Sequence, residues 1–527
     1  FFHIPVLGAL LVTALLVLVQ QSVKRLIVSL FGQRRLIVLS WIPSLVYAIL
    51  LTDRYYYVAG LTGLVVAVTG SAWYVRKVLN DPPLKRISRG LILLAAVYWL
   101  AGGAFLSCAA ALILSEVIRA FEKRRTLPVA ALLATILAYL LFSIVLPLIA
   151  RAFLIRDTVL QAYLSEAYHA VRIYFPLPLV LAFASVPMLL VLFHFLSPAV
   201  NDSRDRRKGM IVLFALAVLA AAGLISFADF SEEREMAYEN FVYAEKWGRV
   251  ISLAESYPPE GGVQRAALNL ALGMTGRLSS DMFHYSQDTS ALFVPYMRRG
   301  MTPFIAGDVL YHLGLVNFAQ MFAMETIEST VDARLPSRAV RRVAETYLLN
   351  GQTEIASKFY KLLNHTLFYR REAEGFQGLA DDTLKISSDR RLARLRSLIP
   401  GRDFFYDQNR MDFALTSLAL SNPSNRMAFG YLMAECMLRK DLDGFLRNIG
   451  LMNRFGYDRV PGPYQEAVAY ILTRIEDPPE GLRSLVTDAS VIARLKEYAS
   501  AYNTAGSDTL KMEREFGDTY WFYLHYR

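Results

Sequence analysis

The sequence has few of the residues from which metal and disulfide sites are built. It contains two cysteines, Cys108 in an apolar run and Cys436 far along a more polar part of the chain, so no internal disulfide is expected. Its seven histidines show no HExxH or other paired metal spacing. The sequence also lacks a Walker A segment, a GxSxG elbow and a GxGxxG after a strand. These absences disfavour a hydrolase or nucleotide enzyme of familiar type, and we predict no metal and no cofactor.

Charged residues are also scarce, at 19% of the chain against 54% hydrophobic residues. Residues 1–227 hold 21 Lys and Arg against 8 Asp and Glu, whereas the remainder holds 35 against 38. The net charge of +10 therefore belongs to the first part, where basic residues cluster in short loops between apolar runs. This distribution is typical of membrane topology, so we expect a lipid bilayer as partner and no nucleic acid.

Apolar runs in the first 227 residues are long enough to cross a bilayer, which takes about 20 residues of helix. The runs cover residues 4–20, 36–52, 56–75, 89–102, 103–118, 128–149, 174–196 and 210–227. Basic clusters follow the first, third, fifth and seventh runs, and this alternation holds only if Gly102 and Gly103 form a hairpin turn. We therefore predict about eight crossings, with everything after residue 227 on the non-cytoplasmic side. Because Phe1 opens directly into a run, we also expect a missing N-terminal segment with a further helix.

Ionisable residues inside the predicted spans are few, which disfavours an ion-coupled transporter. Glu116 lies one turn from a helix end beside Arg119, and His194 lies near the inner boundary, so we expect both side chains to snorkel towards the interface.

The outer loop 151–173 predicts an amphipathic helix that lies on the membrane surface or caps the bundle. Arg151 and Arg156, with Asp53 and His169, are candidate contacts for a lipid phosphate. A plain interfacial helix is the alternative interpretation.

From residue 228 the sequence predicts helices of about 12 to 15 residues separated by short polar turns. In the clearest unit, residues 341–363, Ala344, Tyr347 and Leu348 form an i, i+3, i+4 stripe, and Asn350-Gly351 provides the turn. Similar units occupy residues 237–258, 308–328 and 426–450. The expected fold class is all-α, a polytopic transmembrane helix bundle (1–227) followed by a tetratricopeptide-like α-solenoid (228–527).

Several phrases, FFHIPVLGA, YWLAGG, GMTGRLSSDMFHYSQ, YHLGLVNFAQMFAMETIE and PGPYQEAV, resemble a multi-pass membrane family of Bacteroidota with a tetratricopeptide-like tail. The resemblance covers nearly the whole chain. It implies a bacterial inner-membrane location with the C-terminal domain in the periplasm. It implies no activity, cofactor or catalytic residue.

Two functions lead from the sequence, and a transporter is a third that ranks below both. The first is a membrane-anchored periplasmic scaffold, not an enzyme, whose solenoid binds a protein partner in an envelope complex. The second is a polyprenyl-phosphate-sugar-dependent glycosyltransferase of the multi-pass class, with Arg151, Arg156 and Asp53 facing a lipid phosphate. That likeness is architectural, because the first outer loop that carries the essential acidic residue of such enzymes is not in this sequence.

Overall fold

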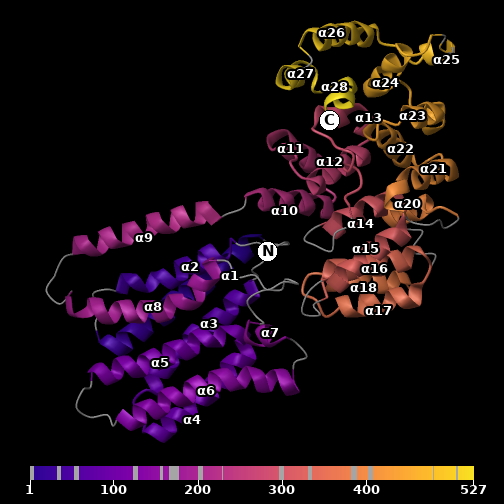
Figure 1. Cartoon of the computed structure of the whole chain (residues 1–527). Coiled ribbons are helices and arrows are strands. Elements are labelled where there is room, and N and C mark those ends of the chain that lie inside the picture. Colours follow the sequence, from indigo (N-terminus) through magenta and orange to yellow (C-terminus); the bar gives the residue numbers. More distant parts are fainter. Residues whose placement is uncertain are drawn as a thin grey trace. The chain divides into compact units, whose positions relative to one another are not determined.

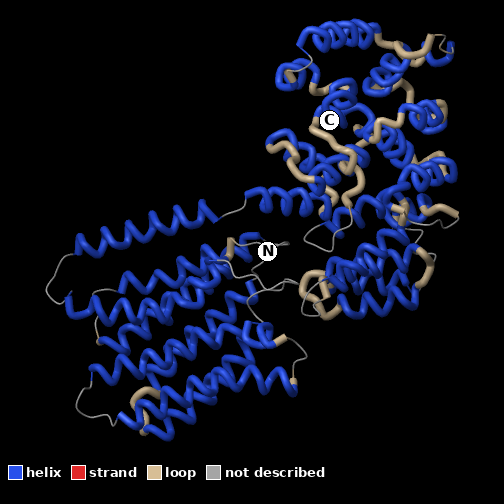
Figure 2. The backbone as a smooth tube through the Cα atoms, in the orientation of Figure 1, coloured by secondary structure: helices blue, strands red, loops and turns tan. Residues whose placement is uncertain are grey.

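The computed structural model describes most of the chain. The described residues are 5–32, 37–52, 58–122, 129–154, 158–164, 177–199, 206–227, 230–295, 302–329, 335–380, 389–401, 407–476, 478, 480–505 and 508–527. Within these ranges every regular element is a helix and no strand occurs (Figures 1 and 2). The expected all-α class is confirmed to that extent.

The chain divides into two compact units, Phe1–Glu232 and Glu233–Arg527. The sequence placed the boundary after residue 227, a few residues earlier. Each unit has its own buried hydrophobic cluster. The two units are therefore described separately.

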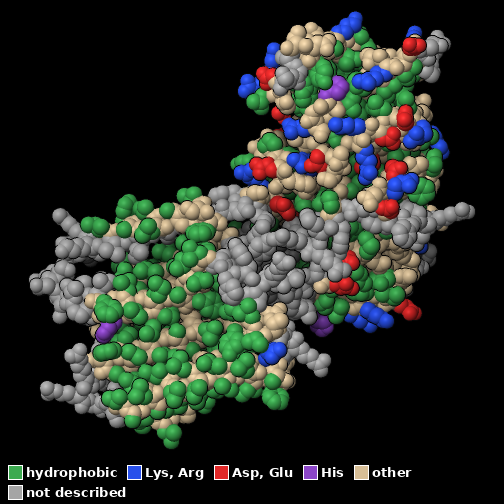
Figure 3. Space-filling view, viewed as in Figure 1, with side chains coloured by type: hydrophobic (Ala, Val, Ile, Leu, Met, Phe, Trp, Pro, Cys, Tyr) green, Lys and Arg blue, Asp and Glu red, His purple; other side chains and the backbone are tan. Residues whose placement is uncertain are grey.

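The N-terminal unit is built from helices that follow the predicted apolar runs. They are α1 (Pro5–Phe31), η1 (Ile37–Trp41), α2 (Ile42–Leu50), α3 (Val58–Lys77), α4 (Pro83–Ala101), η2 (Gly102–Ala104), α5 (Phe105–Glu122), α6 (Val129–Phe153), α7 (Val159–Leu164), α8 (Leu177–Ala199) and α9 (Arg206–Phe227). Large apolar side chains also cover its outside: Trp99 is 77% exposed and Leu137 57%. Figure 3 shows this apolar surface, which suits hydrocarbon as the surrounding solvent.

Four helical stretches are long and apolar enough to cross a membrane. They are Val6–Phe31, Pro83–Phe121, Val129–Phe153 and Leu177–Phe195. The chain is therefore predicted to be membrane-associated. The other expected crossings are not among these four, so the figure of eight stays a prediction.

The stretch Pro83–Phe121 folds back on itself at the glycine pair, as the charge alternation predicted. Arg86 Nε lies 2.9 Å from Glu116 Oε1, although a straight helix would separate these residues by about 45 Å. Gly102 has φ +51°, a left-handed value that favours glycine. A Cβ on Gly103 would lie 2.6 Å from the carbonyl oxygen of Tyr163, so α7 packs directly on the turn. The described part of the outer loop thus caps the hairpin.

The C-terminal unit is a succession of short helices. They are α10 (Phe230–Tyr243), α11 (Trp247–Ser256), α12 (Gly262–Met274), α13 (Leu278–Asp281), η3 (Met282–His284), α14 (Thr302–Leu313), α15 (Val316–Ser329), α16 (Ser337–Leu349), α17 (Thr353–Leu363), α18 (Arg370–Ala380), α20 (Arg390–Leu398), η5 (Gln408–Arg410), α21 (Met411–Ser421), α22 (Arg426–Leu438), α23 (Leu442–Ile449), η6 (Met452–Phe455), α24 (Gly462–Leu472), α25 (Glu480–Arg483), α26 (Ala489–Ala505), α27 (Thr509–Phe516) and α28 (Tyr520–Tyr526).

Each of the four segments expected to be a repeat unit contains two helices joined by a short turn. Helices α14 and α15, α16 and α17, and α22 and α23 pack against each other within their pairs, and α15 packs on α16 of the next pair. Gly314 (φ +96°) and Gly351 (φ +76°) make two of the turns in left-handed backbone. The assignment of these pairs to the tetratricopeptide class stays a prediction.

The last helix closes the core of this unit. The Trp521 side chain is fully buried and donates from Nε1 to the Glu466 carbonyl, 2.8 Å away. The Tyr523 hydroxyl donates to the Leu438 carbonyl at 2.7 Å, and its ring lies 5.4 Å from that of Phe283. Tyr238 and Tyr523, near the two ends of the unit's sequence, belong to one buried cluster.

Candidate functional site

Of the predicted lipid-phosphate contacts, the structure describes only one. Asp53, Arg156 and His169 lie outside the described residues. Arg151 lies in the last turn of α6 with an exposed side chain. No observation on the described residues brings the four together, so both their role and the glycosyltransferase alternative stay predictions.

A buried polar cluster lies inside the N-terminal unit. Glu116 is 1% exposed and pairs with Arg86, which is 2% exposed. The Tyr74 hydroxyl donates to Glu116 Oε1 at 2.6 Å and lies 2.8 Å from the Tyr139 hydroxyl. The expectation that Glu116 snorkels is therefore wrong. The carboxylate is satisfied within the bundle, because α4 and α5 of the hairpin bring Arg86 beside it.

This cluster links four helices through an ion pair and hydrogen bonds. Tyr74, Arg86, Glu116 and Tyr139 come from α3, α4, α5 and α6. The Tyr139 ring fits because residue 90 is glycine, where a Cβ would lie 2.0 Å from the Tyr139 hydroxyl oxygen. A charged side chain is tolerated in hydrocarbon when it is paired and hydrogen-bonded. We therefore interpret this cluster as structural, holding α3, α4, α5 and α6 together.

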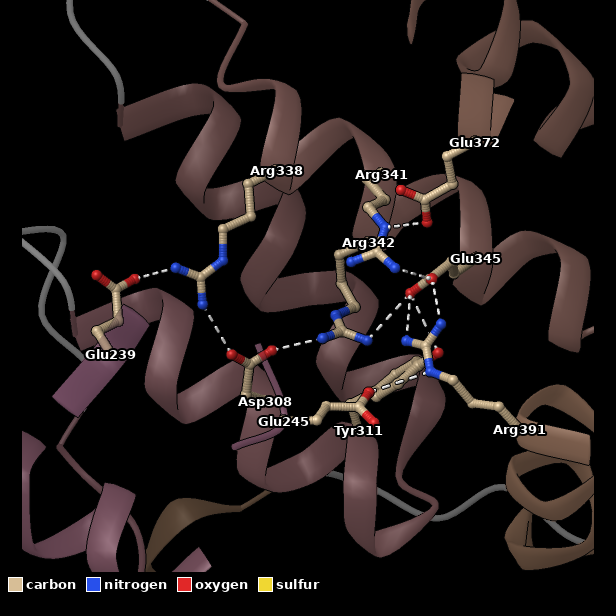
Figure 4. A network of polar contacts seen from close by, with 10 residues as sticks. All are labelled: Glu239, Glu245, Asp308, Tyr311, Arg338, Arg341, Arg342, Glu345, Glu372 and Arg391. Carbon is tan, nitrogen blue, oxygen red and sulfur yellow. Dashed lines mark hydrogen bonds and ion pairs between the residues drawn. The ribbon is translucent and has the colours of Figure 1, made fainter. Parts of the chain in front are cut away.

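A larger ionic network is buried in the C-terminal unit, and Figure 4 shows its residues. Glu345 of α16 is fully buried and contacts three guanidinium groups, those of Arg391 at 2.9 Å, Arg342 at 3.1 Å and Arg341 at 3.2 Å. Arg342 also contacts Asp308 of α14 at 2.6 Å. The carboxylate of Glu345 thus balances positive charge from α16 and α20 at one point.

Further pairs extend the network to two more helices. Arg338 lies between Asp308, at 2.9 Å, and Glu239 of α10, with which it forms a close ion pair. Arg341 reaches Glu372 of α18 at 2.6 Å. The network therefore links α10, α14, α16, α18 and α20 through charge-assisted hydrogen bonds.

The environment of each group determines its protonation. Burial alone would raise the pKa of Glu345, but the attraction of Arg341, Arg391 and Arg342 holds this pKa far below its ordinary value. Burial likewise opposes ionisation of Asp308, yet Arg342 and Arg338 keep its pKa below the ordinary value. Glu345 and Asp308 are therefore ionised at neutral pH.

In two neighbouring groups burial outweighs the charges around them and favours the uncharged form. Burial raises the pKa of Glu239 to about 7, with Arg338 opposing the shift. Burial and the nearby charge of Arg342 lower the pKa of His312 to about 3, so the imidazole is neutral at pH 7. His312 thus adds no further cation to the network.

The cavity beside this network is too small for an organic ligand. Its volume is about 20 Å³, and its lining includes Tyr243, Phe304, Arg338 and Glu345. A single water molecule needs about 10–15 Å³ on this measure. We interpret the network as a framework that fixes the helices relative to one another.

A second hollow in the same unit is large enough for a ligand, with a volume of about 290 Å³. We call it the basic hollow, and its lining consists of Gly273, Met274, Gly276, Leu278, Ser279, Arg394, Ser397, Leu398, Ser424, Asn425, Arg426, Met427, Gly430 and Tyr457. Among the described residues, this lining contains two arginines and no Asp, Glu, His or Cys. It therefore offers hydrogen-bond donors and positive charge, and Tyr457 is the lining side chain of a type that serves in general acid–base catalysis.

The described residues of the chain contain no candidate metal site. Among the described residues, no group of three or more His, Cys, Asp and Glu side chains is placed to hold a metal ion. Cys108 and Cys436 are both buried and unpaired by a disulfide.

Comparison with known families identifies one family model that covers the whole chain. Residues 1–527 match the family described as "Family of unknown function (DUF6057)". The chain belongs to this family. The expected membership of a family without a known activity is thus confirmed, whereas the Bacteroidota assignment stays a prediction. No curated protein and no solved structure matches the chain.

Neither the network nor the basic hollow was predicted from the sequence. Residues 341–345 were interpreted by their apolar stripe alone. The sequence does contain a signal for the network. Arg341 and Arg342 precede Glu345 by four and three residues, a spacing that places positive and negative side chains on one face of a helix. The hollow has no comparable signal, because its residues come from four separate segments.

Proposed function

We propose that this member of the DUF6057 family is a membrane-anchored scaffold whose C-terminal unit binds a protein partner. In this proposal the N-terminal unit spans the bacterial inner membrane several times, and the C-terminal unit lies in the periplasm. The observation that carries the proposal is the basic hollow, which is large enough for a ligand and lies in a unit of packed helix pairs. The other unit of the chain has an apolar exterior.

Rigidity of the C-terminal unit supports a binding role. The network around Glu345 links five helices. In addition, Tyr523 of α28 donates a hydrogen bond to the Leu438 carbonyl at the end of α22. A surface whose helices are held in place loses little conformational entropy when a partner binds. Stacked helix pairs also create extended surfaces on which peptides and proteins bind.

The chemistry of the hollow favours binding over catalysis. Its side chains donate hydrogen bonds from guanidinium, hydroxyl and amide groups. A reaction would need a nucleophile paired with a base, or an acid and a base with separated pKa values. The part of the lining that the structure describes contains hydroxyl groups but no histidine, carboxylate or thiol.

Purification from native membranes tests the partner. The full-length tagged chain, extracted in mild detergent, is expected to bring down at least one protein in stoichiometric amount, identified by mass spectrometry. The variant Glu345→Gln, which loosens the framework, should recover less of it. Glu374→Gln removes an exposed carboxylate of α18 and should recover as much as the wild type. Isolation of a lone protein under these conditions would overturn the proposal.

Cysteine labelling tests the orientation. Cys108 and Cys436 are buried, so the wild type gives a low background with a membrane-impermeant maleimide. Lys361 of α17 and Lys77 at the end of α3 are exposed. We expect Lys361→Cys to react in intact spheroplasts and Lys77→Cys to react only after permeabilisation. The reverse pattern would place the C-terminal unit in the cytoplasm.

A further inference from the structure

We infer that the basic hollow is an oxyanion site, which binds a carboxylate or phosphate group carried by the partner. The inference rests on the proposed function and names the chemistry by which the C-terminal unit would recognise its partner. Four features of the described part of the hollow support it: unpaired positive charge, the absence of carboxylates, a tyrosine hydroxyl group and the end of a helix.

Among the described residues, the two arginines of the hollow have no acidic partner. Arg394 of α20 and Arg426 at the start of α22 are exposed, and among the described residues neither forms an ion pair. In contrast, the arginines of the buried network all contact carboxylates. Two unpaired guanidinium groups on one concave surface attract an oxyanion, to which each donates in a planar fork.

Arg426 is held in place by its surroundings. Its Cζ lies 4.1 Å from the centroid of the Tyr457 ring, and one of its N–H groups points to the Gly456 carbonyl at 3.4 Å. Stacking on an aromatic ring restricts the side chain and leaves other N–H groups of the guanidinium available. The arginine is therefore oriented before a ligand arrives.

A chain of hydroxyl groups reaches the hollow at Tyr457. The buried Tyr464 hydroxyl donates to Ser279 Oγ at 2.9 Å, and Ser279 Oγ lies 3.0 Å from the Tyr457 hydroxyl. Because Ser279 accepts from Tyr464, its own proton is free to donate to Tyr457. When Ser279 donates this bond, the Tyr457 proton is left for an acceptor in the hollow, whereas in the reverse direction the Tyr457 proton lies on Ser279 Oγ.

The N-terminal end of α22 adds to the positive potential. Ser424, Asn425, Arg426 and Met427 all line the hollow, and Asn425 caps the helix by accepting from the Ala428 N–H at 3.1 Å. Helix α22 has 13 residues, so its dipole places partial positive charge at this end. The helix end, the two arginines and the tyrosine proton all favour the same class of ligand.

Direct binding measurements test the site. Full-length protein in nanodiscs of zwitterionic phosphatidylcholine is titrated calorimetrically with inorganic phosphate, with a short acetylated peptide that has a free carboxyl terminus, and with the amide of that peptide. We expect phosphate, the free-carboxyl peptide or both to bind, more weakly as salt increases, and the amide not to bind. The arm that binds identifies the source of the oxyanion.

Variants connect the binding to the named residues. Arg394→Gln and Arg426→Gln should each weaken binding at least about tenfold, as expected for a lost charge-assisted hydrogen bond. Tyr457→Phe should weaken it by a smaller factor. Arg396→Gln is the matched control, because Arg396 is an exposed arginine of α20 outside the lining. No binding of either anion, or equal binding by the arginine variants and the wild type, would overturn the inference.

Capture of the partner separates this inference from the proposed function. A double variant, Arg394→Gln with Arg426→Gln, should lose both the anion and the partner. A partner that is still captured by this variant would support the scaffold and overturn the hollow as its site. Anion binding in a protein that captures no partner would overturn the scaffold and leave the oxyanion site standing.

Discussion

Substitution of Glu345 by glutamine tests whether the buried network stabilises the C-terminal unit. The change preserves the size of the side chain and removes one negative charge from among three guanidinium groups at 2.9–3.2 Å. Removal of one member of a buried ionic cluster costs about 3–5 kcal/mol, because the opposing charges stay buried without compensation. For a unit of about 295 residues this corresponds to a fall in melting temperature of about 5–8 °C.

The assay is thermal unfolding of the full-length protein in detergent. Limited proteolysis of the C-terminal unit monitors the unfolding. Glu374→Gln is the control, because Glu374 and its partner Arg370 are both more than half exposed, and such pairs contribute less than about 1 kcal/mol. A Glu345→Gln melting temperature within about 1 °C of the wild type would refute the argument that the network is a stabilising framework.

Three further results are expected. Gly90→Ala should lower the melting temperature of the N-terminal unit, since its Cβ would meet the Tyr139 hydroxyl at 2.0 Å. Gly248→Ala, in the C-terminal unit and with open space around its Cβ, should leave the melting temperatures of both units unchanged. A thermal aggregation curve of Gly90→Ala equal to that of the wild type would contradict this. The folded pKa of His312, about 3, lies below its unfolded value, so its contribution to stability is lost as pH falls below about 6.5. His312→Gln should flatten the decline in melting temperature with acid, and an unchanged decline would show that other groups cause it. Trp521→Ala should lower the free energy of unfolding by about 3–5 kcal/mol and make α28 accessible to proteases. A C terminus that stays uncleaved in this variant would contradict that.

Part of this protein follows from the sequence alone. The uneven charge, 21 basic against 8 acidic residues before residue 228, and the apolar runs predicted a membrane bundle with a turn at Gly102-Gly103. The contact between Arg86 and Glu116 confirms that turn. Such features are predictable because hydrophobicity and helix period depend on residues close together in the sequence.

Tertiary structure alone decided the polar sites. The partner of Glu116 is Arg86, 30 residues away, so the sequence suggested the adjacent Arg119 and a snorkelling side chain instead. Arg394 and Arg426 come to one hollow because α20 and α22 pack against other helices of the C-terminal unit. Long-range pairing depends on how helices stack, and the apolar stripe of a helix fixes which face is buried without specifying which charged side chains meet there.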